Sequence, residues 1–501
     1  MRVITKIEVS QKQAFIFSTN TLKDMVYRSN LIAYIMSVEF IKKATGKDIQ
    51  QNLIYSGGGH VLLEFDSYES AGDVVKKYTN YIHKTNQGVE VFVKSIGFND
   101  DKNWGEKLKK LDVELEAKKA MRLASFHQGT FGIESIDSNT RKAEVQNIEI
   151  IINEDDSKED IVTKSGYKSV SKFEELGSTK GESSFIAVVH IDGNAMAKRF
   201  EDFYDENNDL EWESFKSKLR ELSNVVDIAF EDAFKNMQSL VIKDLDEGKL
   251  DDLNLKEKNF PVRKIILAGD DICFVSDGRI GIECAVNLIR EVNKKGYSAC
   301  AGIAIVHQKY PFYIAYELAE KLCGNAKKMC ARYSQDGYGS NVSAIDWHIE
   351  YGEMKDHLDE IRRMYNTNDG KHLEMRPYII NADADVLDNE ELKYRQYEKF
   401  RNLVKSIIES DMDYANGKMK ELRNVLKQGE ESTEFYLRFY KIGDLIVDSI
   451  DKFNNEISKD DLRKLFSGEP DKKCIFVKTE DGKERSILFD AIEISDTFIA
   501  L

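Results

Sequence analysis

Residues 265–275 read Ile-Ile-Leu-Ala-Gly-Asp-Asp-Ile-Cys-Phe-Val, and this stretch decides the fold of the region around it. One apolar run leads into Gly269, Asp270 and Asp271, and a second apolar run leaves them. Two buried strands with turn residues between them form a β-hairpin. The adjacent carboxylates at its tip are costly unless they face water or a cation. The stretch therefore indicates either a solvated turn or a divalent-metal site.

The composition describes a large protein without a membrane span. The chain has 501 residues, of which 42% are hydrophobic, enough for several domains with their own cores. The six cysteines form no C-x-x-C pair, which disfavours a zinc ribbon and suits a reducing cytoplasm. The N-terminus lacks the apolar core of a signal peptide, and no apolar run approaches about 18 residues. We therefore expect a cytoplasmic protein with no membrane contact.

The formal charge of -16 limits the partners. Broad, nonspecific adhesion to nucleic acid needs clustered Lys and Arg, and an acidic chain disfavours it. A local basic groove and the binding of metal–nucleotide complexes both remain compatible with this charge.

Hydrophobic periodicity predicts a β-α-β-β-α-β order twice along the chain. The first unit comprises strands at 2–17 and 89–98, helices at 21–44 and 68–85, and a central hairpin at 53–65. The second begins with a buried strand at 185–191, contains the hairpin at 265–275, and ends with a strand at 298–306 and a helix opened by Pro311. We predict the α+β class: two ferredoxin-like domains and a C-terminal helical domain.

The predicted boundaries follow from composition. Residues 1–100 form the first ferredoxin-like unit, and 101–184 form a helical and irregular linker with a charged loop from 153 onward. Residues 185–380 form the second unit with the Gly-Asp-Asp hairpin. Residues 381–501 form the helical domain, with charged helices at 388–426 and 431–466 and a terminal hairpin around Asp481-Gly482.

A third carboxylate strengthens the metal hypothesis. Asp192 follows the strand 185–191, and in the split βαβ topology this strand lies beside the one that carries the hairpin turn. Asp192, Asp270 and Asp271 are therefore expected at one edge of the sheet, where they would repel each other without a cation. Hard oxygen ligands suit Mg²⁺ or Mn²⁺. The alternative is that Asp192 caps the following helix.

Several neighbouring residues are candidates for nucleotide binding. Gly193 and Asn194 precede a helix whose N–H groups could cradle phosphates, although Gly-Asn is also common turn chemistry. Lys327 lies late in the helix after Pro311, where it either favours the helix dipole or contacts a triphosphate. In the first unit, the turn 57–59 has no second carboxylate for a metal, and it favours close approach of a nucleotide or of the partner domain.

Taken together, these residues resemble the two palm domains of the large subunit of type III CRISPR effector complexes, a cyclic oligoadenylate synthase. The matching phrases lie at 8–17, 22–23 and 56–59 in the first palm and at 192–194, 268–271, 301–304, 319–320, 326–327 and 375–378 thereafter. The usual Gly-Gly-Asp-Asp of that family is Ala268-Gly269-Asp270-Asp271 here, and alanine is tolerated if this position does not need a positive φ. The chain has no His-Asp dipeptide and none of the zinc-binding cysteines, so a compact, cyclase-only member without the nuclease domain is expected.

The resemblance implies a nucleotidyltransferase that makes a cyclic oligonucleotide, an oligoadenylate signal in antiviral defence, from ATP with two Mg²⁺ or Mn²⁺ ions. The implied metal ligands are Asp192, Asp270, Asp271 and the carbonyl of Ile191, and the implied nucleotide contacts are Gly193, Asn194, Gly269, Lys327, Ser10, Gly57, Gly58 and Gly59. Its implied partners are ATP or other nucleoside triphosphates, CRISPR-type effector subunits and guide or target RNA, with a homo-oligomer left open.

Two alternatives remain at this point. One is an RNA-binding scaffold subunit with little or no catalysis, which the complete Asp192, Asp270 and Asp271 set disfavours. The other is a cyclase that makes a mononucleotide or dinucleotide product, since such cyclases share the pattern of the second palm but not the first palm.

Overall fold

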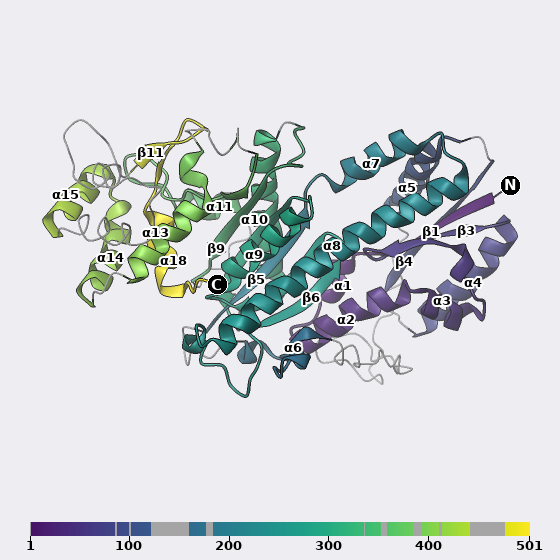
Figure 1. Ribbon diagram of the computed structural model, residues 1–501, viewed down its shortest axis with the longest axis horizontal. Coiled ribbons are helices and arrows are strands. Elements are labelled where there is room, and N and C mark those ends of the chain that lie inside the picture. The colour runs from purple at the N-terminus through teal and green to yellow at the C-terminus, as the bar shows by residue number, and fades with distance from the viewer. Residues whose placement is uncertain are drawn as a thin grey trace.

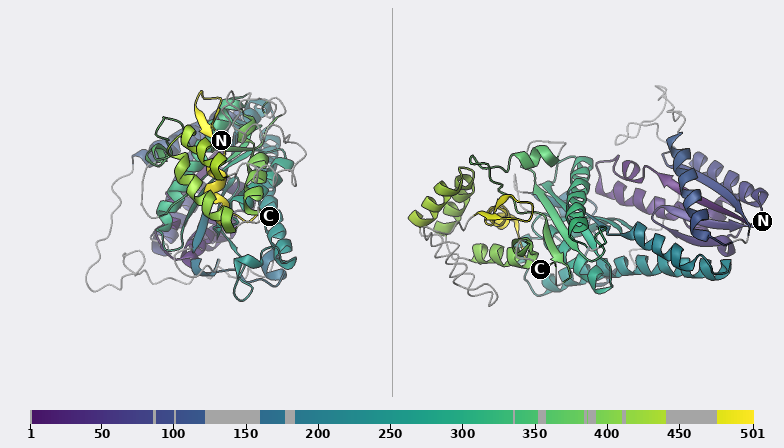
Figure 2. Two further views of the ribbon diagram at one scale, coloured as in Figure 1. Left: turned by 90° about the vertical axis from the view of Figure 1, so that its left-hand side faces the viewer. Right: turned by 90° about the horizontal axis from the view of Figure 1, so that it is seen from above.

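The computed structural model describes residues 2–85, 88–99, 102–121, 160–176, 184–334, 336–351, 358–383, 386, 392–409, 413–440 and 476–501. The molecule is elongated, with the N-terminal sheet at one end, a second sheet in the middle and the C-terminal helices at the other end (Figures 1 and 2). Helices alternate with strands along the chain, and the described strand pairs of the two large sheets are antiparallel except for one parallel pair in the second sheet, so the chain has the predicted α+β class.

The N-terminal sheet contains four antiparallel strands in the order β2-β3-β1-β4. They are β1 (Arg2–Ser10), β2 (Leu53–Gly57), β3 (His60–Phe65) and β4 (Glu90–Phe98). Helices α2 (Leu22–Ile35), α3 (Val38–Thr45) and α4 (Tyr68–Thr85) pack on one face of this sheet. The predicted helix at 21–44 is thus two helices, because Ser37 accepts a hydrogen bond from the N–H of Phe40 and starts α3.

The prediction of a strand as far as residue 17 is wrong. Strand β1 ends at Ser10, Gln11 adopts a left-handed φ of 51°, and α1 (Lys12–Ile16) follows. The apolar run is not a strand because it makes a contact between the two halves of the molecule: the ring of Phe17 lies 4.2 Å from that of Tyr316, centroid to centroid. Of this apolar run, Ile16 and Phe17 are buried, by a short helix that the sequence did not predict.

The second sheet has six strands in the order β10-β9-β8-β5-β7-β6. These are β5 (Phe185–Gly193), β6 (Val262–Ala268), β7 (Asp271–Asp277), β8 (Ala299–His307), β9 (Ser343–Ile349) and β10 (Tyr378–Asn381). Only the pair β8–β9 is parallel. Helix α9 (Gly281–Lys294) packs on the face that carries Ala187, and α10 (Phe312–Tyr333) covers the face that carries His190. Strands β9 and β10 were not anticipated from the sequence.

Helix α8 (Trp212–Asp246) joins the two sheets. Its 35 residues span about 52 Å at 1.5 Å per residue. Phe215 and Leu219, in its first half, share a core with Ile4 of the first sheet and Trp104 of α5 (Trp104–Ala120), whereas Phe234, in its second half, packs against the second sheet. Helices α5 and α7 (Met196–Asn207) lie beside this first half, so residues on both sides of position 184 build one core.

The linker and the C-terminal region are described in part. Residues 160–176 contain α6 (Ile161–Lys164) and a 3-10 turn, η3 (Phe173–Glu175), and the predicted strand at 145–152 lies outside the described residues. Helices α13 (Tyr397–Glu409), α14 (Asp413–Leu426) and α15 (Glu430–Tyr440) occupy the described part of the region predicted to be helical. Strands β11 (Phe476–Lys478) and β12 (Glu484–Ser486) form the predicted hairpin around Asp481-Gly482, and α18 (Phe489–Ile494) follows.

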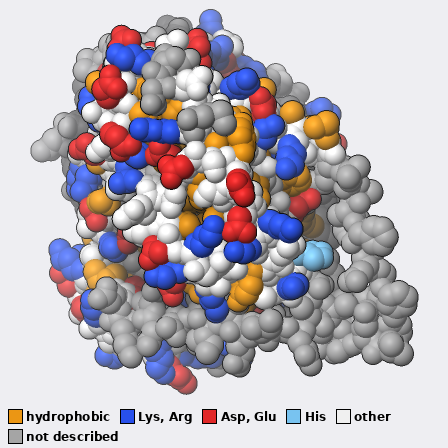
Figure 3. Space-filling view, turned by 90° about the vertical axis from the view of Figure 1, so that its right-hand side faces the viewer, with side chains coloured by type: hydrophobic (Ala, Val, Ile, Leu, Met, Phe, Trp, Pro, Cys, Tyr) orange, Lys and Arg blue, Asp and Glu red, His pale blue; other side chains and the backbone are white. Residues whose placement is uncertain are grey.

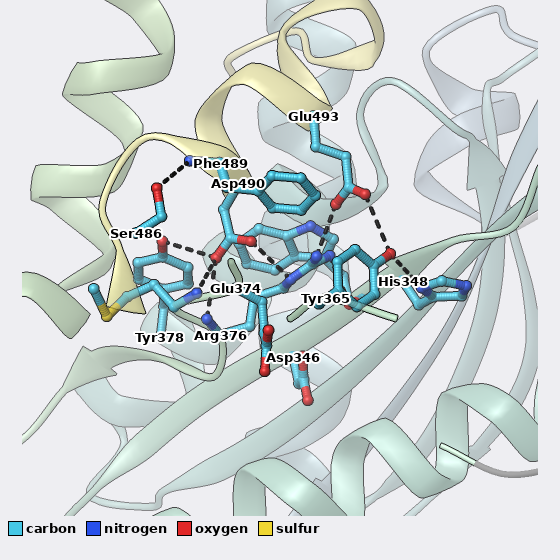
Figure 4. Close-up of polar contacts among 12 residues, drawn as sticks. Asp346, His348, Tyr365, Glu374, Arg376, Tyr378, Ser486, Phe489, Asp490 and Glu493 are labelled. Carbon is cyan, nitrogen blue, oxygen red and sulfur yellow. Dashed lines mark hydrogen bonds and ion pairs between the residues drawn. The ribbon is translucent and has the colours of Figure 1, made fainter. Parts of the chain in front are cut away.

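A buried network of charges attaches the C-terminal end to the second sheet (Figure 4). The guanidinium of Arg376 lies 2.7 Å from Glu493 and 3.2 Å from Asp490, and all three side chains are 0% exposed. Arg376 also donates to the carbonyl of Trp347 in β9 at 2.9 Å, and the hydroxyl of Tyr378 donates to Asp490 at 3.1 Å. Each buried charge thus has a partner of the opposite sign, which burial requires.

The face at the N-terminal end of the molecule carries positive and negative side chains interspersed with apolar ones (Figure 3). Such a surface does not attract a polyanion as a continuous basic patch would. Within the described residues, every helix is too short or too polar to span a lipid bilayer.

Candidate active site

The Gly-Asp-Asp stretch forms the predicted tight hairpin. Ala268, the last residue of β6, pairs with Asp271, the first residue of β7, so Gly269 and Asp270 alone make the turn. Gly269 has a φ of +67°, the left-handed region that favours glycine. Ala268 lies in the extended strand and needs no positive φ, so alanine is accepted at this position.

The three predicted acids meet at one edge of the second sheet. Ile191 of β5 pairs with Ile272 of β7, which places Asp192 beside Asp271 in the ladder. Asp270 lies against Gly193: a Cβ atom at Gly193 would be 2.7 Å from the Cβ of Asp270, so only glycine fits there. The two turns are therefore packed against each other, and the acids come from both.

The electrostatics of this edge favour a cation. Burial, and then the negative charge of Asp192, raise the pKa of Asp271 to about 7 and that of Asp270 to about 6. The Oδ1 atom of Asp271 is buried without a hydrogen-bond partner within the described residues, and the Nδ1 atom of His190, at 3.6 Å, is likewise unpartnered. Burial lowers the pKa of His190, which disfavours the charged ring as a partner for this carboxylate.

Lys327 supplies a counter-charge for Asp192. Its ammonium group lies 2.6 Å from Asp192 and donates to the carbonyl of Gly193 at 3.0 Å. Although burial opposes it, the charge of Asp192 raises the pKa of Lys327, which stays protonated. Within the part of the chain that the structure describes, no three Asp, Glu, His or Cys side chains form a ready-made cage for a metal. The unpartnered oxygen of Asp271 and the oxygen donors beside it nevertheless fit a hard cation.

Two of the predicted contacts are engaged inside the protein. The side chain of Asn194 is 5% exposed and donates to the carbonyl of Val342 at 2.8 Å, while its backbone N–H donates to Ser298. Neither donor of Asn194 is therefore directed at a ligand in this structure. Ile191 is fully buried and paired with neighbouring strands on both sides, so only its backbone carbonyl is left as a ligand candidate.

The glycine turn of the first sheet is also assembled. Gly57 pairs with His60, so Gly58 and Gly59 form the turn, with φ of +57° and +79°. The carbonyl of Gly59 accepts a hydrogen bond from the N–H of Val9, the residue before Ser10. The predicted first-palm group, Ser10 with Gly57–Gly59, is therefore brought together at the end of β1.

Two charged residues that were not predicted connect the two turns. Lys12 donates to the carbonyl of Gly58, and its positive charge also acts on Asp271, lowering the pKa of that carboxyl against the effect of burial. Asp227 of α8 lies between the turns: its Oδ2 is 3.4 Å from a Cβ position at Gly57, and its Oδ1 is 3.2 Å from that of Gly269. Lys12 lies two residues after Ser10 and could have been considered, whereas nothing in the sequence around Asp227 distinguishes it.

Solved structures identify the architecture. Csm1 from T. onnurineus superposes with a TM-score of 0.56 at 15% identity, over 99% of this chain and 69% of Csm1. The chain has the Csm1 fold. Csm1–Csm4 cassettes in complex with AMPPNP and with cA4 superpose with TM-scores of 0.55 and 0.53, at 15% and 14% identity, over 99% of this chain and 69% of theirs. The predicted resemblance to the large subunit of type III CRISPR complexes is confirmed as a likeness of fold. No protein-family profile and no curated protein sequence matches the chain.

Proposed function

We propose that this protein is a nucleotidyltransferase that joins ATP molecules into a cyclic oligonucleotide, an oligoadenylate signal in a CRISPR-type defence. The observation that carries the proposal is the meeting of Asp192, Asp270 and Asp271 at one edge of the second sheet, opposite the glycine turn of the N-terminal sheet. It is supported by the Csm1 fold, since Csm1–Csm4 cassettes are known in complex with AMPPNP, ATP and cA4.

Each group at the site has a proposed part. Asp192, Asp270, Asp271 and the carbonyl of Ile191 would hold two Mg²⁺ or Mn²⁺ ions, which when bound would neutralise the triphosphate and activate the attacking hydroxyl. Lys327 is already held at the same edge by Asp192, and its ammonium is placed to bind a phosphate oxygen once a cation replaces it there.

The first sheet would hold the second nucleotide. The turn formed by Gly58 and Gly59 exposes backbone rather than side chains, and Lys12 and Ser10 lie beside it. In this arrangement one nucleotide lies at each turn, and reaction follows from their juxtaposition, as is typical of phosphoryl and nucleotidyl transfer.

We further propose that the two sheets are ferredoxin-like palm domains. When the strands are numbered along each unit, the N-terminal sheet has the order 2-3-1-4. The strands β6-β7-β5-β8 of the larger sheet have the same order. Residues 1–100 and 185–380 would be the palms, 101–184 a linker and 381–501 the helical domain. A second protein subunit is a proposed partner in the cytoplasm, because similar solved structures include Csm1–Csm4 cassettes. RNA is proposed as a further partner on the resemblance to CRISPR effector subunits.

The proposal is tested by product analysis. Purified protein is incubated with each of the four nucleoside triphosphates and Mg²⁺ or Mn²⁺, with and without RNA, and the products are read by mass spectrometry. We expect oligoadenylates from the wild type and none from Asp270→Ala/Asp271→Ala, while Asp202→Asn, an exposed acid on α7, behaves as wild type. Identical product-free traces from wild type and the double variant would refute the enzyme proposal and favour the scaffold alternative.

A further inference from the structure

We propose that Asp227 of α8 accepts a hydrogen bond from a ribose hydroxyl of the nucleotide at the Gly-Asp-Asp turn and thereby selects ribonucleotides over deoxyribonucleotides. This inference rests on the proposed function, and it assigns to that site a specificity residue contributed by neither sheet.

The position of Asp227 is set by rigid elements on both sides. Helix α8 is attached to the first sheet by Arg220, whose Nε donates to the carbonyl of Ile54 in β2 at 2.9 Å. Two helical turns further on, the Asp227 carboxylate reaches both Gly57 and Gly269, at 3.4 Å and 3.2 Å from their Cβ positions. A side chain at Gly269 would press against this carboxylate, so the glycine leaves room for it as well as for the turn.

The half-buried carboxylate of Asp227 has no partner among the described residues. Within the described residues, Asp227 makes no hydrogen bond or ion pair. Burial, with a contribution from Glu231 one turn later, raises the pKa of this carboxyl to about 6, the direction expected where no protein cation compensates the charge. A half-buried carboxylate held between two turns, with no donor among the described residues, is suited to accept hydrogen bonds from a ligand.

The chemistry of a nucleotide decides which group it meets. A carboxylate repels phosphates, so Asp227 requires an uncharged donor. Gly269, whose Cβ position lies 3.2 Å from the Asp227 carboxylate, directly precedes the acids proposed to hold the metal ions that would bind the triphosphate, and the ribose is the part of a nucleotide bonded to that triphosphate. The two vicinal hydroxyls of a ribose also match the two acceptor oxygens of a carboxylate. The base lies further from the phosphate than the sugar does, so a ribose hydroxyl is the donor expected to meet Asp227.

The experiment measures binding rather than turnover. Full-length wild type, Asp227→Ala, Asp227→Asn and Glu231→Gln are titrated calorimetrically with ATP, 2′-deoxy-ATP, 3′-deoxy-ATP and inosine triphosphate, with Ca²⁺ as the cation. Glu231→Gln removes one exposed acid of the same helix and serves as the matched control. Thermal unfolding of each variant verifies the fold.

We expect the wild type and the Glu231→Gln control to bind ATP about tenfold more tightly than at least one deoxy analogue, as for a hydrogen bond to a charged group. Asp227→Ala should lose this preference by binding ATP more weakly, with its affinity for that deoxy analogue unchanged. Asp227→Asn, which keeps one acceptor oxygen, should lie between them. Which analogue loses affinity identifies the hydroxyl.

Three results would overturn the inference. The first is a wild type that binds ATP and both deoxy analogues equally; the second is an Asp227→Ala variant that weakens all ligands in the same ratio, which would indicate a structural role. The third is a change only between ATP and inosine triphosphate, which would mean that Asp227 reads the base. Failure of the wild type to bind any triphosphate would instead remove the proposed function itself, so the two failures are distinguishable.

Discussion

Replacing Arg376 by methionine should destabilise the attachment of the C-terminal end more than any surface change. The side chain is 0% exposed and lies between the carboxylates of Asp490 and Glu493, which are also fully buried. Arg376→Met leaves both carboxylates without their main counter-charge and removes the donor to the Trp347 carbonyl. Removing one partner of a buried pair costs about 3–5 kcal/mol, against a typical total stability of about 5–15 kcal/mol.

Neutralising the carboxylates should restore much of this loss. In Arg376→Met with Asp490→Asn and Glu493→Gln, no unpaired charge stays buried, and the amide oxygen of residue 490 can still accept from the N–H of Met375. The single variant is destabilised by an uncompensated charge, whereas the triple variant replaces a buried ion network with neutral groups of similar size, which is often close to neutral.

The tryptophans give a local probe for this experiment. Trp347 stacks on Tyr378 at 5.3 Å, and Arg376 lies over its ring, whereas Trp104 of α5 and Trp212 of α8 lie in the core that packs on the first sheet. Urea unfolding is followed by the emission of Trp347 in a background where the other two are phenylalanine.

Arg438→Met is the matched control for Arg376→Met. Arg438 is exposed on α15 and, among the residues that the structure describes, pairs with Glu434, and its loss should change stability by less than about 1 kcal/mol. A loss below 1 kcal/mol for Arg376→Met, or a triple variant no more stable than the single one, would refute the charge-pairing argument.

Three further outcomes concern the site. Gly193→Ala places a Cβ 2.7 Å from that of Asp270 and should reduce product formation roughly 100-fold with little change in thermal stability, since misplacement of about 1 Å has such effects; a fully active variant would contradict the packing. Lys327→Met should weaken ATP binding about tenfold in calorimetry, with partial rescue in Lys327→Arg, and unchanged affinity would limit Lys327 to pairing with Asp192. Because the pKa of Asp227 is raised to about 6, the folded state retains a proton that the unfolded state has released, so stability should fall as pH rises from about 4 to about 6. Asp227→Asn should lack this fall and be about 1 kcal/mol more stable at pH 7 in urea unfolding, a value below the full shift because the side chain is partly exposed; equal pH profiles would contradict it.

The elements predicted well are those in which local pattern and tertiary role agree. The hairpin at Gly269 has two apolar runs and a turn that requires glycine, and α4 matches the predicted 68–85. Strand β9 was missed because Asp346 and His348, although buried, are polar, and their partners include residues distant in the sequence, Arg362 and Tyr365. Periodicity cannot reveal polar residues whose burial depends on long-range pairing.

The candidate site divides in the same way. Asp192, Asp270 and Asp271 could be placed together because strand order fixes which strand ends are neighbours. The engagement of Asn194 in the interior, the pairing of Lys327 with Asp192, and the position of Asp227 depend on how helices and loops pack, for which no short pattern exists.

Helix α8 packs on both sheets, and this affects how the chain can be divided into fragments. Because Phe215 and Leu219 complete the core of a sheet formed by residues before 100, a fragment that ends near 184 would expose the indole of Trp104 and the surrounding apolar face to water. A fragment beginning at 185 would in turn carry half of a 35-residue helix with nothing to cover it. The two sheets should therefore unfold as one cooperative unit, and insertions or deletions within α8 would rotate one turn of the site against the other by about 100° per residue.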